Sequence, residues 1–175
     1  MQLTFVPMKS FDRSAPRKNI LQIDDARLVF RNFGGDKDVY DKTGKRNFAV
    51  VIPTQKQADD LMADTNEYGL SWNVKVKAPR DEGDEPFRYM KVAIAFNDRG
   101  PEIWLNSNGN RRRLTEETVS ILDNIDIESV DLDVRPYDGN GNYGPFRKAY
   151  LVGMEVYQNI SRFSARYAEE EYPEE

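Results

Sequence analysis

Residues 87–96 read Phe-Arg-Tyr-Met-Lys-Val-Ala-Ile-Ala-Phe, and they predict the most clearly defined β-strand of the chain. Aromatic and β-branched side chains favour extended backbone because they pack well on a pleated surface. Residues 98–101 contain Gly and Pro and predict a turn, after which residues 102–105 are expected to return as the partner strand. The sequence therefore predicts a fold based on antiparallel strands.

Strand and turn signals continue on both sides of this run. Residues 72–77, Trp-Asn-Val-Lys-Val-Lys, alternate apolar and polar side chains, which predicts a strand with Trp72 and both valines inward and its two lysines outward. The remaining strands are expected at residues 26–33, 46–52, 126–135 and 146–157, with a bulge between Ile127 and Val130 where the apolar phase shifts. Polar connections are expected at residues 34–45, 78–86, 106–113 and 136–145.

Two or three short helices are predicted among these strands. Thr54 and Gln57 have the spacing of a capping box, for a helix that stops near Gly69. Thr115 is expected to cap a second helix over residues 116–124, and residues 161–168 are expected to form a third.

Together these elements predict a mainly β fold, specifically an OB-like antiparallel β-barrel with two or three short helices. Residues 1–19 are assigned to an extended N-terminal arm, because they are mixed in character and contain two prolines. Residues 20–168 are assigned to the barrel domain, and residues 169–175 to a disordered acidic C-terminal tail.

The net charge of -5 is concentrated at the C-terminus. The 175 residues include 25 Lys and Arg against 30 Asp and Glu, and the last seven residues hold five of the carboxylates and no base. The rest of the chain is therefore electrically balanced. A terminus of this kind has two interpretations. It is either an unstructured, solvated chain end, or a polyanion that competes with nucleic acid for a basic groove and docks on partner proteins. The residues assigned to such a partner-binding tail are Glu169, Glu170, Glu171, Tyr172, Pro173, Glu174 and Glu175.

The absence of Cys and His excludes most common enzyme designs. Without them the chain has no disulfide, thiol nucleophile, imidazole base, or zinc site that uses Cys or His. We expect no cofactor, no metal site and no catalytic residues. The sequence contains no run of 18 apolar residues that would predict a membrane span, and the expected location is the cytoplasm.

Basic residues recur beside aromatic residues on several predicted strands. Single-stranded nucleic acid is bound by this combination, because cations neutralise phosphates and aromatic rings stack on bases. Each aromatic alone is more often a core residue, so the recurrence carries the prediction. The expected phosphate-contacting residues are Arg31, Lys45, Arg46, Lys75, Lys77, Arg80, Arg111, Arg112 and Arg113, and the expected stacking residues are Phe33, Phe48, Trp72, Tyr89 and Trp104.

A carboxylate cluster leaves one catalytic alternative open. Asp123, Asp126, Glu128, Asp131 and Asp133 fall within eleven residues, and a Mg²⁺-dependent nuclease requires carboxylates that converge on metal ions. An alternating strand with a solvated outer face explains the same residues more simply.

The chain resembles a family of phage and prophage proteins regarded as single-stranded DNA-binding proteins. The resemblance lies in residues 26–33, 46–52, 72–75 and 79–87 and in the ending from residue 165, and it covers roughly residues 20–175. It implies an OB-like barrel that coats single strands during phage replication or recombination, with an acidic tail that recruits replication proteins.

The leading hypothesis is therefore a non-catalytic, sequence-independent single-stranded DNA-binding protein, regulated by its tail and able to form homo-oligomers. Replication or recombination proteins are the partners expected for the tail. The alternative is a phage-encoded protein-interaction module, an inhibitor or accessory protein, that binds no nucleic acid.

Overall fold

The computed structural model describes residues 1–9, 18–37 and 44–160 of the chain. Within these ranges the chain forms ten strands and two short helices, and the prediction of a mainly β fold is confirmed. In chain order the elements are β1 (Gln2–Pro7), β2 (Asn19–Ala26), β3 (Leu28–Asn32), β4 (Asn47–Val51), α1 (Gln55–Ala63), β5 (Val74–Lys77), β6 (Phe87–Ala93), β7 (Glu102–Ser107), β8 (Asn110–Leu114), the 3₁₀ helix η1 (Val119–Asp123), β9 (Ile127–Gly141) and β10 (Gly144–Gln158).

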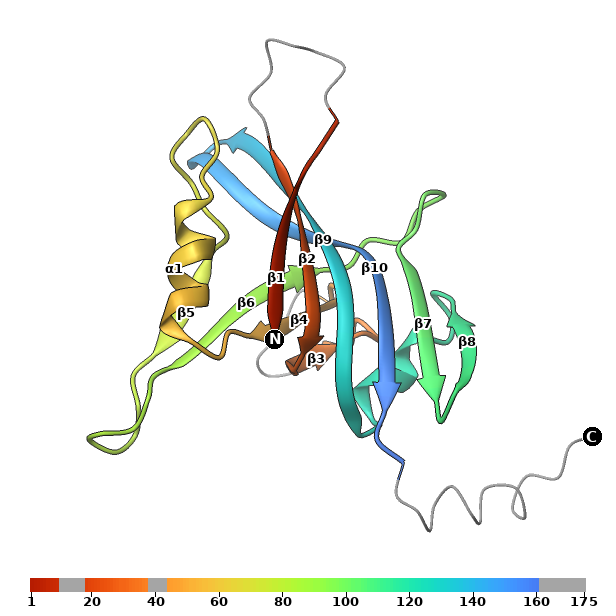
Figure 1. The fold of residues 1–175 in the computed structure, drawn as a ribbon. Coiled ribbons are helices and arrows are strands. Elements are labelled where there is room, and N and C mark those ends of the chain that lie inside the picture. The colour runs from red at the N-terminus through yellow and green to blue at the C-terminus, as the bar shows by residue number, and fades with distance from the viewer. Residues whose placement is uncertain (10–17, 38–43, 161–175) are drawn as a thin grey trace, which may run out of the picture.

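A long hairpin of β9 and β10 forms the middle of the sheet (Figure 1). On one side β9 pairs with β2, and β2 pairs with β1, both antiparallel. On the other side β10 pairs in parallel with β6 at the single pair Tyr150 and Ala93, and then with β7 from Gly153 onward. The hairpin therefore connects all the other strands.

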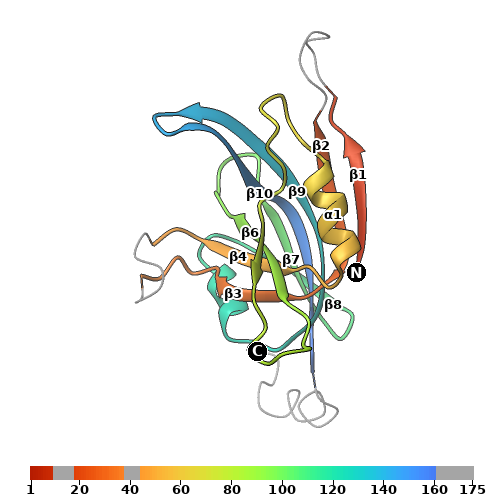
Figure 2. The same ribbon diagram turned by 90° about the vertical axis from the view of Figure 1, so that its left-hand side faces the viewer.

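The second half of the sheet continues from β6 through β4 to β3, with β5 on the other edge of β6. Figure 2 shows β3 and β4 running across the direction of β9 and β10, so the sheet is strongly bent. The end strands β1 and β3 are not paired with each other. Within the described residues the strands therefore form an open sheet. The specific OB-type assignment stays a prediction.

The core lies on the inner face of this bent sheet. Every second residue of the central strands is buried there, for example Met90 and Val92 on β6, because successive side chains on a strand point to opposite faces. Two helices cover the remaining openings. α1 contributes Ala58 and Leu61, and η1 contributes Val119 and Leu122.

Both described helices lie within the spans predicted for them, but each is shorter than predicted. Thr54 caps α1 by accepting a hydrogen bond from the backbone N–H of Gln57 at 3.2 Å, which confirms the predicted N-cap; the Gln57 side chain donates to the Met1 carbonyl at 2.7 Å. α1 ends at Ala63 rather than near Gly69, because Asp64 leaves helical geometry. Residues 119–123 form a 3₁₀ helix within the span 116–124 expected to be helical, and the expected cap at Thr115 is wrong, because Thr118 precedes this helix and its side chain makes no capping hydrogen bond. The third expected helix, at residues 161–168, lies outside the described residues.

Three strand predictions were wrong. Residues 2–7 form a strand paired with β2, where a separate arm was expected. The expected basic loop at 106–113 is most of the β7–β8 hairpin, whose turn residues Asn108 and Gly109 both have positive φ. This Asn-Gly turn matches the twist of the flanking strands and allows a two-residue connection. β6 and β7 do not pair along their length as a hairpin, because β10 pairs with both of them in succession.

The β9–β10 hairpin is also more regular than expected. Its ladder runs to the pair Gly141 and Gly144, so the expected long turn at 136–145 is reduced to two residues. The predicted bulge is confirmed, since Glu128 lies opposite no residue between the pairs of Ile127 and Ser129.

Candidate nucleic-acid interface

The outer face of the sheet carries a surface of cations and aromatic rings that we call the basic face. Residues paired across neighbouring strands point to the same side, so the register of β5, β6, β9 and β10 determines its members. They are Lys75 and Lys77 on β5, Phe87, Tyr89 and Lys91 on β6, Arg135 and Tyr137 on β9, and Phe146, Lys148 and Tyr150 on β10, together with Phe30 of β3.

One aromatic cluster lies at the β3–β6 end of the basic face. The ring centroid of Phe30 is 5.3 Å from that of Tyr89 and 6.2 Å from that of Phe87. Lys77 Nζ lies 5.1 Å from the Phe30 ring centroid. Phe30 is 56% exposed and has a φ of 51°, a left-handed conformation that bulky residues rarely adopt. The backbone therefore presents this ring to solvent at a cost in strain.

A second aromatic cluster lies on the β9–β10 hairpin. The ring centroid of Tyr137 is 6.0 Å from that of Phe146 and 5.9 Å from that of Tyr150. Cations flank both partners, since the Arg135 guanidinium lies 5.4 Å from the Tyr150 centroid and Lys148 Nζ lies 5.7 Å from that of Phe146. Both ends of the basic face thus offer flat rings beside positive charge.

A groove of about 330 Å³ separates the two clusters. It forms because β6 and β10 pair only at Ala93 and Tyr150, which leaves a space between the strands on one side of that point. Lys75, Lys91 and Lys148 line the groove, and Lys45 and Arg46 line it from the start of β4. It is therefore a hollow with predominantly cationic walls.

Most cations of the basic face are not neutralised by the protein itself. Among the described residues, Lys75, Lys77, Lys91, Arg135 and Lys148 form no ion pair with a carboxylate, while Arg46 has Glu116 at 4.0 Å. Like charges gathered on one surface repel each other, so this arrangement favours binding of a polyanion.

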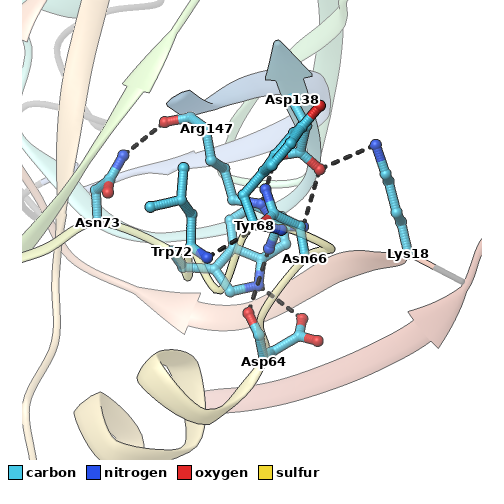
Figure 3. Close-up of polar contacts among 9 residues, drawn as sticks. Lys18, Asp64, Asn66, Tyr68, Trp72, Asn73, Asp138 and Arg147 are labelled. Carbon is cyan, nitrogen blue, oxygen red and sulfur yellow. Dashed lines mark hydrogen bonds and ion pairs between the residues drawn. The ribbon is translucent and has the colours of Figure 1, made fainter. Parts of the chain in front are cut away.

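A buried polar network supports the groove from the inner side of the hairpin (Figure 3). Arg147 Nε and Nη2 donate to the two carboxylate oxygens of Asp138 at 2.7 and 3.1 Å, and Lys18 Nζ lies 3.0 Å from Asp138. The Arg147 guanidinium also lies 5.2 Å from the Trp72 ring centroid. Burial alone would raise the pKa of Asp138, but the hydrogen bonds from Arg147 and Lys18 outweigh it and lower that pKa to about 2. Asp138 is therefore ionised at neutral pH and holds Arg147 beneath the groove.

Comparison with known proteins gives the family of the chain. The family model described as "Putative phage ssDNA-binding domain" matches residues 12–174. The chain belongs to this family. No curated protein sequence matches it.

Solved structures of the single-stranded DNA-binding protein from bacteriophage Enc34 are similar to the chain. Its C-terminal truncation has a TM-score of 0.47 at 12% identity, covering 92% of this chain and 98% of that chain. The untruncated protein gives 0.47 at 11% identity over 91% and 93% of the two chains. The structure in complex with ssDNA gives 0.45 at 14% identity over 91% and 98%.

For this member of the phage ssDNA-binding family, the basic face unites five of the residues predicted from sequence. Lys75, Lys77 and Tyr89 are part of it, and Lys45 and Arg46 line its groove. Arg80 lies exposed in the connection between β5 and β6. The predicted tail residues, 169–175, lie outside the described residues.

Three of the predicted stacking residues belong to the core, and their assignment is corrected. Phe33 and Phe48 are fully buried and stack on each other at 5.1 Å, and Trp72 is 1% exposed. Trp72 Nε1 donates to Asp64 at 2.8 Å, which satisfies its one polar group. None of these rings has a face open to a base.

Arg31 is likewise assigned a structural role. Its Nη1 donates to the backbone carbonyls of Leu122 and Ile125 at 2.7 and 2.8 Å, which fastens β3 to the end of η1. The guanidinium therefore satisfies carbonyls that η1 leaves unpaired at its end.

The remaining predicted residues lie on the β7–β8 hairpin, beside acidic residues. Arg111 forms a 2.8 Å ion pair with Glu155 and lies 4.4 Å from the Trp104 ring centroid. Trp104 Nε1 donates to Glu102 at 2.7 Å. Arg112 and Arg113 are exposed. This hairpin is thus partly neutralised, unlike the basic face.

Sequence reasoning missed more than half of the basic face. Phe30, Phe87, Lys91, Arg135, Tyr137, Phe146, Lys148 and Tyr150 were not among the predicted residues. The alternation of residues 146–150, Phe-Arg-Lys-Ala-Tyr, carries a usable signal, since Phe146, Lys148 and Tyr150 share one face of a strand.

Two of the five carboxylates considered for metal catalysis, Asp123 and Asp131, accept backbone hydrogen bonds and so have structural roles. Asp123 accepts hydrogen bonds from the backbone N–H groups of Phe33 and Gly34 at 2.7 and 2.9 Å, and Asp131 accepts one from Asp25 N–H at 2.9 Å. Within the described ranges, no three acidic residues are arranged to hold a metal ion. In the same part of the chain, no helix has the length and apolar character required to span a bilayer.

Proposed function

We propose that the chain binds single-stranded DNA without sequence preference through the basic face. The observation that carries the proposal is the gathering on one face of two aromatic clusters and five cations that form no ion pair among the described residues, from strands far apart in sequence. The family description names ssDNA as the ligand, which supports the same choice. Lysines would track the phosphates through the groove, and the rings at both ends would stack on bases.

The absence of sequence preference follows from the chemistry of the face. Rings and ammonium groups contact features that every nucleotide shares, since each base has a flat face and each phosphate has the same charge. We therefore infer a non-catalytic coating role in phage DNA replication or recombination. In this role the acidic tail would compete with DNA and recruit replication or recombination proteins.

A salt titration with two matched triple variants tests the proposal. The probe is a dye-labelled dT oligomer of about 15 nucleotides, followed by fluorescence anisotropy from about 50 mM salt upward. Lys75→Gln/Lys91→Gln/Lys148→Gln should reduce the slope of log affinity against log salt by about 2, since each phosphate contact contributes about 0.7. Arg111→Gln/Arg112→Gln/Arg113→Gln changes the net charge equally and should reduce the slope less, because Glu155 already neutralises Arg111.

Two outcomes would contradict the proposal. Equal losses in the two triple variants would show that total charge, rather than the basic face, determines binding. Failure of the wild-type protein to bind the oligomer, with or without residues 169–175, would overturn DNA binding itself. In that case a stoichiometric protein partner recovered after nuclease treatment would favour the protein-interaction module.

A further inference from the structure

A second hollow lies beyond the groove, at the turn between β6 and β7. It has a volume of about 610 Å³ and is lined by Asn97, Asp98, Arg99, Pro101, Arg135 and Tyr150, among others. We call it the turn pocket. It shares Tyr150 with the groove, so this one ring forms the boundary between the two hollows.

The position of Tyr150 follows from the strand pairing. β6 contacts β10 only at Ala93 and Tyr150, and the chain then turns through residues 97–100 before β7 pairs with β10 from Gly153. The groove lies on one side of this contact and the turn pocket on the other. A DNA strand that follows the groove would therefore have to cross the Tyr150 ring to reach the turn pocket.

The turn pocket contains two cations suited to a phosphate. Arg135 is held against the Tyr150 ring at 5.4 Å, and neither Arg135 nor Arg99 forms an ion pair in the part of the chain that the structure describes. The turn that carries Arg99 has a defined shape. Asn97 and Gly100 exchange backbone hydrogen bonds of 2.9 and 3.2 Å, and the Asn97 side chain accepts a hydrogen bond from Arg99 N–H at 2.8 Å.

Guanidinium groups fit this task better than ammonium groups would. An arginine offers several donors in a planar fork that matches phosphate oxygens, and it stays charged at any physiological pH. Arginines line the turn pocket, whereas lysines predominate in the groove, so the two hollows differ in chemistry.

We propose that the DNA path crosses Tyr150 and ends in the turn pocket, where Arg99 and Arg135 bind one backbone phosphate and Tyr150 stacks on the adjacent base. The inference rests on the proposed function and extends it to a binding subsite beyond the groove. Asp98 also lines the pocket, and its negative charge repels a phosphate there. Removing that charge should therefore strengthen binding, whereas removing Arg99 should weaken it.

The test compares two oligomer lengths on three variants of the full chain. The probes are dye-labelled dT oligomers of about 5 and about 15 nucleotides, the first sized to the groove alone and the second to the whole path. Arg99→Gln should weaken binding of the long oligomer about two- to fivefold and reduce its salt slope by about 0.7, with no change for the short one. Asp98→Asn should tighten binding of the long oligomer only.

Lys56→Gln is the matched control, because it removes one charge from the outer surface of α1, where the lysine side chain is 85% exposed. It should leave both oligomers unaffected. If Arg99→Gln and Asp98→Asn leave long-oligomer binding unchanged while the wild-type protein binds both probes, the subsite is wrong and the proposed function stands. If the wild-type protein binds neither probe, both are wrong.

Discussion

Phe30 and Phe33 are three residues apart, yet their rings have opposite surroundings. Phe33 is fully buried against Phe48, whereas Phe30 is 56% exposed and has the left-handed φ of 51°. This left-handed conformation lies at the irregularity of the β3–β4 ladder between Val29 and Asn32, and it is unusual for an exposed bulky residue. Binding provides a reason for it, since the ring stands beside Lys77 where a base would stack.

Replacing Phe30 with Gly separates binding from stability. Phe30→Gly should weaken dT binding about 5- to 150-fold, the equivalent of the 1–3 kcal/mol that one stacked base contributes. It should not lower the thermal midpoint, because Gly adopts positive φ without strain. Fluorescence anisotropy and a thermal melt measure the two quantities.

Phe33→Leu is the converse control in the core. It should destabilise the fold by about 1–2 kcal/mol and leave the affinity of the folded protein unchanged. A Phe30→Gly variant that melts earlier and binds normally would assign Phe30 to structure instead.

At the scale of elements, the β9–β10 hairpin presents different chemistry on its two faces. Lys148 and Tyr150 point outward to the groove, while Arg147, the residue before Lys148, points inward to Asp138. Asn73 also donates to the Arg147 carbonyl at 2.6 Å, so the segment before β5 is attached to β10. The buried ion pair therefore fixes β10 to β9, and the Asn73 hydrogen bond attaches the segment before β5, which also lines the groove, to β10.

The Asp138 carboxylate makes this attachment dependent on pH. Its pKa of about 2 lies below the ordinary value of 3.8, so ionisation favours the folded state. The contribution is fully present above about pH 4 and is lost as the pH falls toward 2, and it amounts to about 2 kcal/mol. Asp138→Asn should cost about 3–5 kcal/mol at pH 7, because it leaves Arg147 buried without its partner.

Urea unfolding of both proteins at several pH values measures this contribution. The difference in unfolding free energy between wild type and Asp138→Asn should shrink by about 2 kcal/mol between pH 5 and pH 2. Asp60→Asn on the surface of α1 should show a much smaller difference at every pH. A constant difference for Asp138→Asn would contradict the lowered pKa.

At the scale of the whole molecule, charge is distributed unevenly. The basic face carries unpaired cations, whereas the β7–β8 end pairs its Arg111 with Glu155, and the five tail carboxylates account for the entire net charge. Removing the tail brings the formal charge from -5 to zero. The net negative charge of the chain therefore belongs to a segment that can be deleted.

Deletion of residues 169–175 should tighten binding of the dT oligomer severalfold at about 50 mM salt. The gain should vanish at about 1 M salt, where the screening length falls to about 3 Å. Anisotropy titrations at both salt concentrations measure it. A tail of the same length with its five Glu changed to Gln should bind like the truncated protein, and unchanged affinity in both would rule out competition by the tail.

The sequence predicted many strands but few of their partners. The N-cap at Thr54 and the bulge near Glu128 depend on local spacing, and both were predicted correctly. The pairing of β10 with β6 and then with β7 depends on residues about 50 positions apart, and no local pattern reports it. The β7–β8 hairpin was missed although Asn108-Gly109 is a local hairpin signal, because the surrounding polar residues were interpreted as a loop.

The sequence predicted the chemical type of the candidate site, cations beside aromatic rings, but only some of its residues. Lys75, Lys77 and Tyr89 could be assigned from alternation, because their strands are regular. Phe48 and Trp72 were misassigned because alternation shows which side chains share a face, and only packing shows which face is covered.

The sequence by itself determined the mainly β class, the N-cap at Thr54 and the bulge, the mixture of cations with aromatics, and the concentration of net charge in the last seven residues. All of these are properties of neighbours along the chain. Tertiary structure alone decided that Phe30 is exposed and Phe33 buried, that Arg147 is held by Asp138, and that cations from β5, β6, β9 and β10 share one surface. Those outcomes depend on sheet register and on long-range pairing, which place residues distant in sequence on the same face.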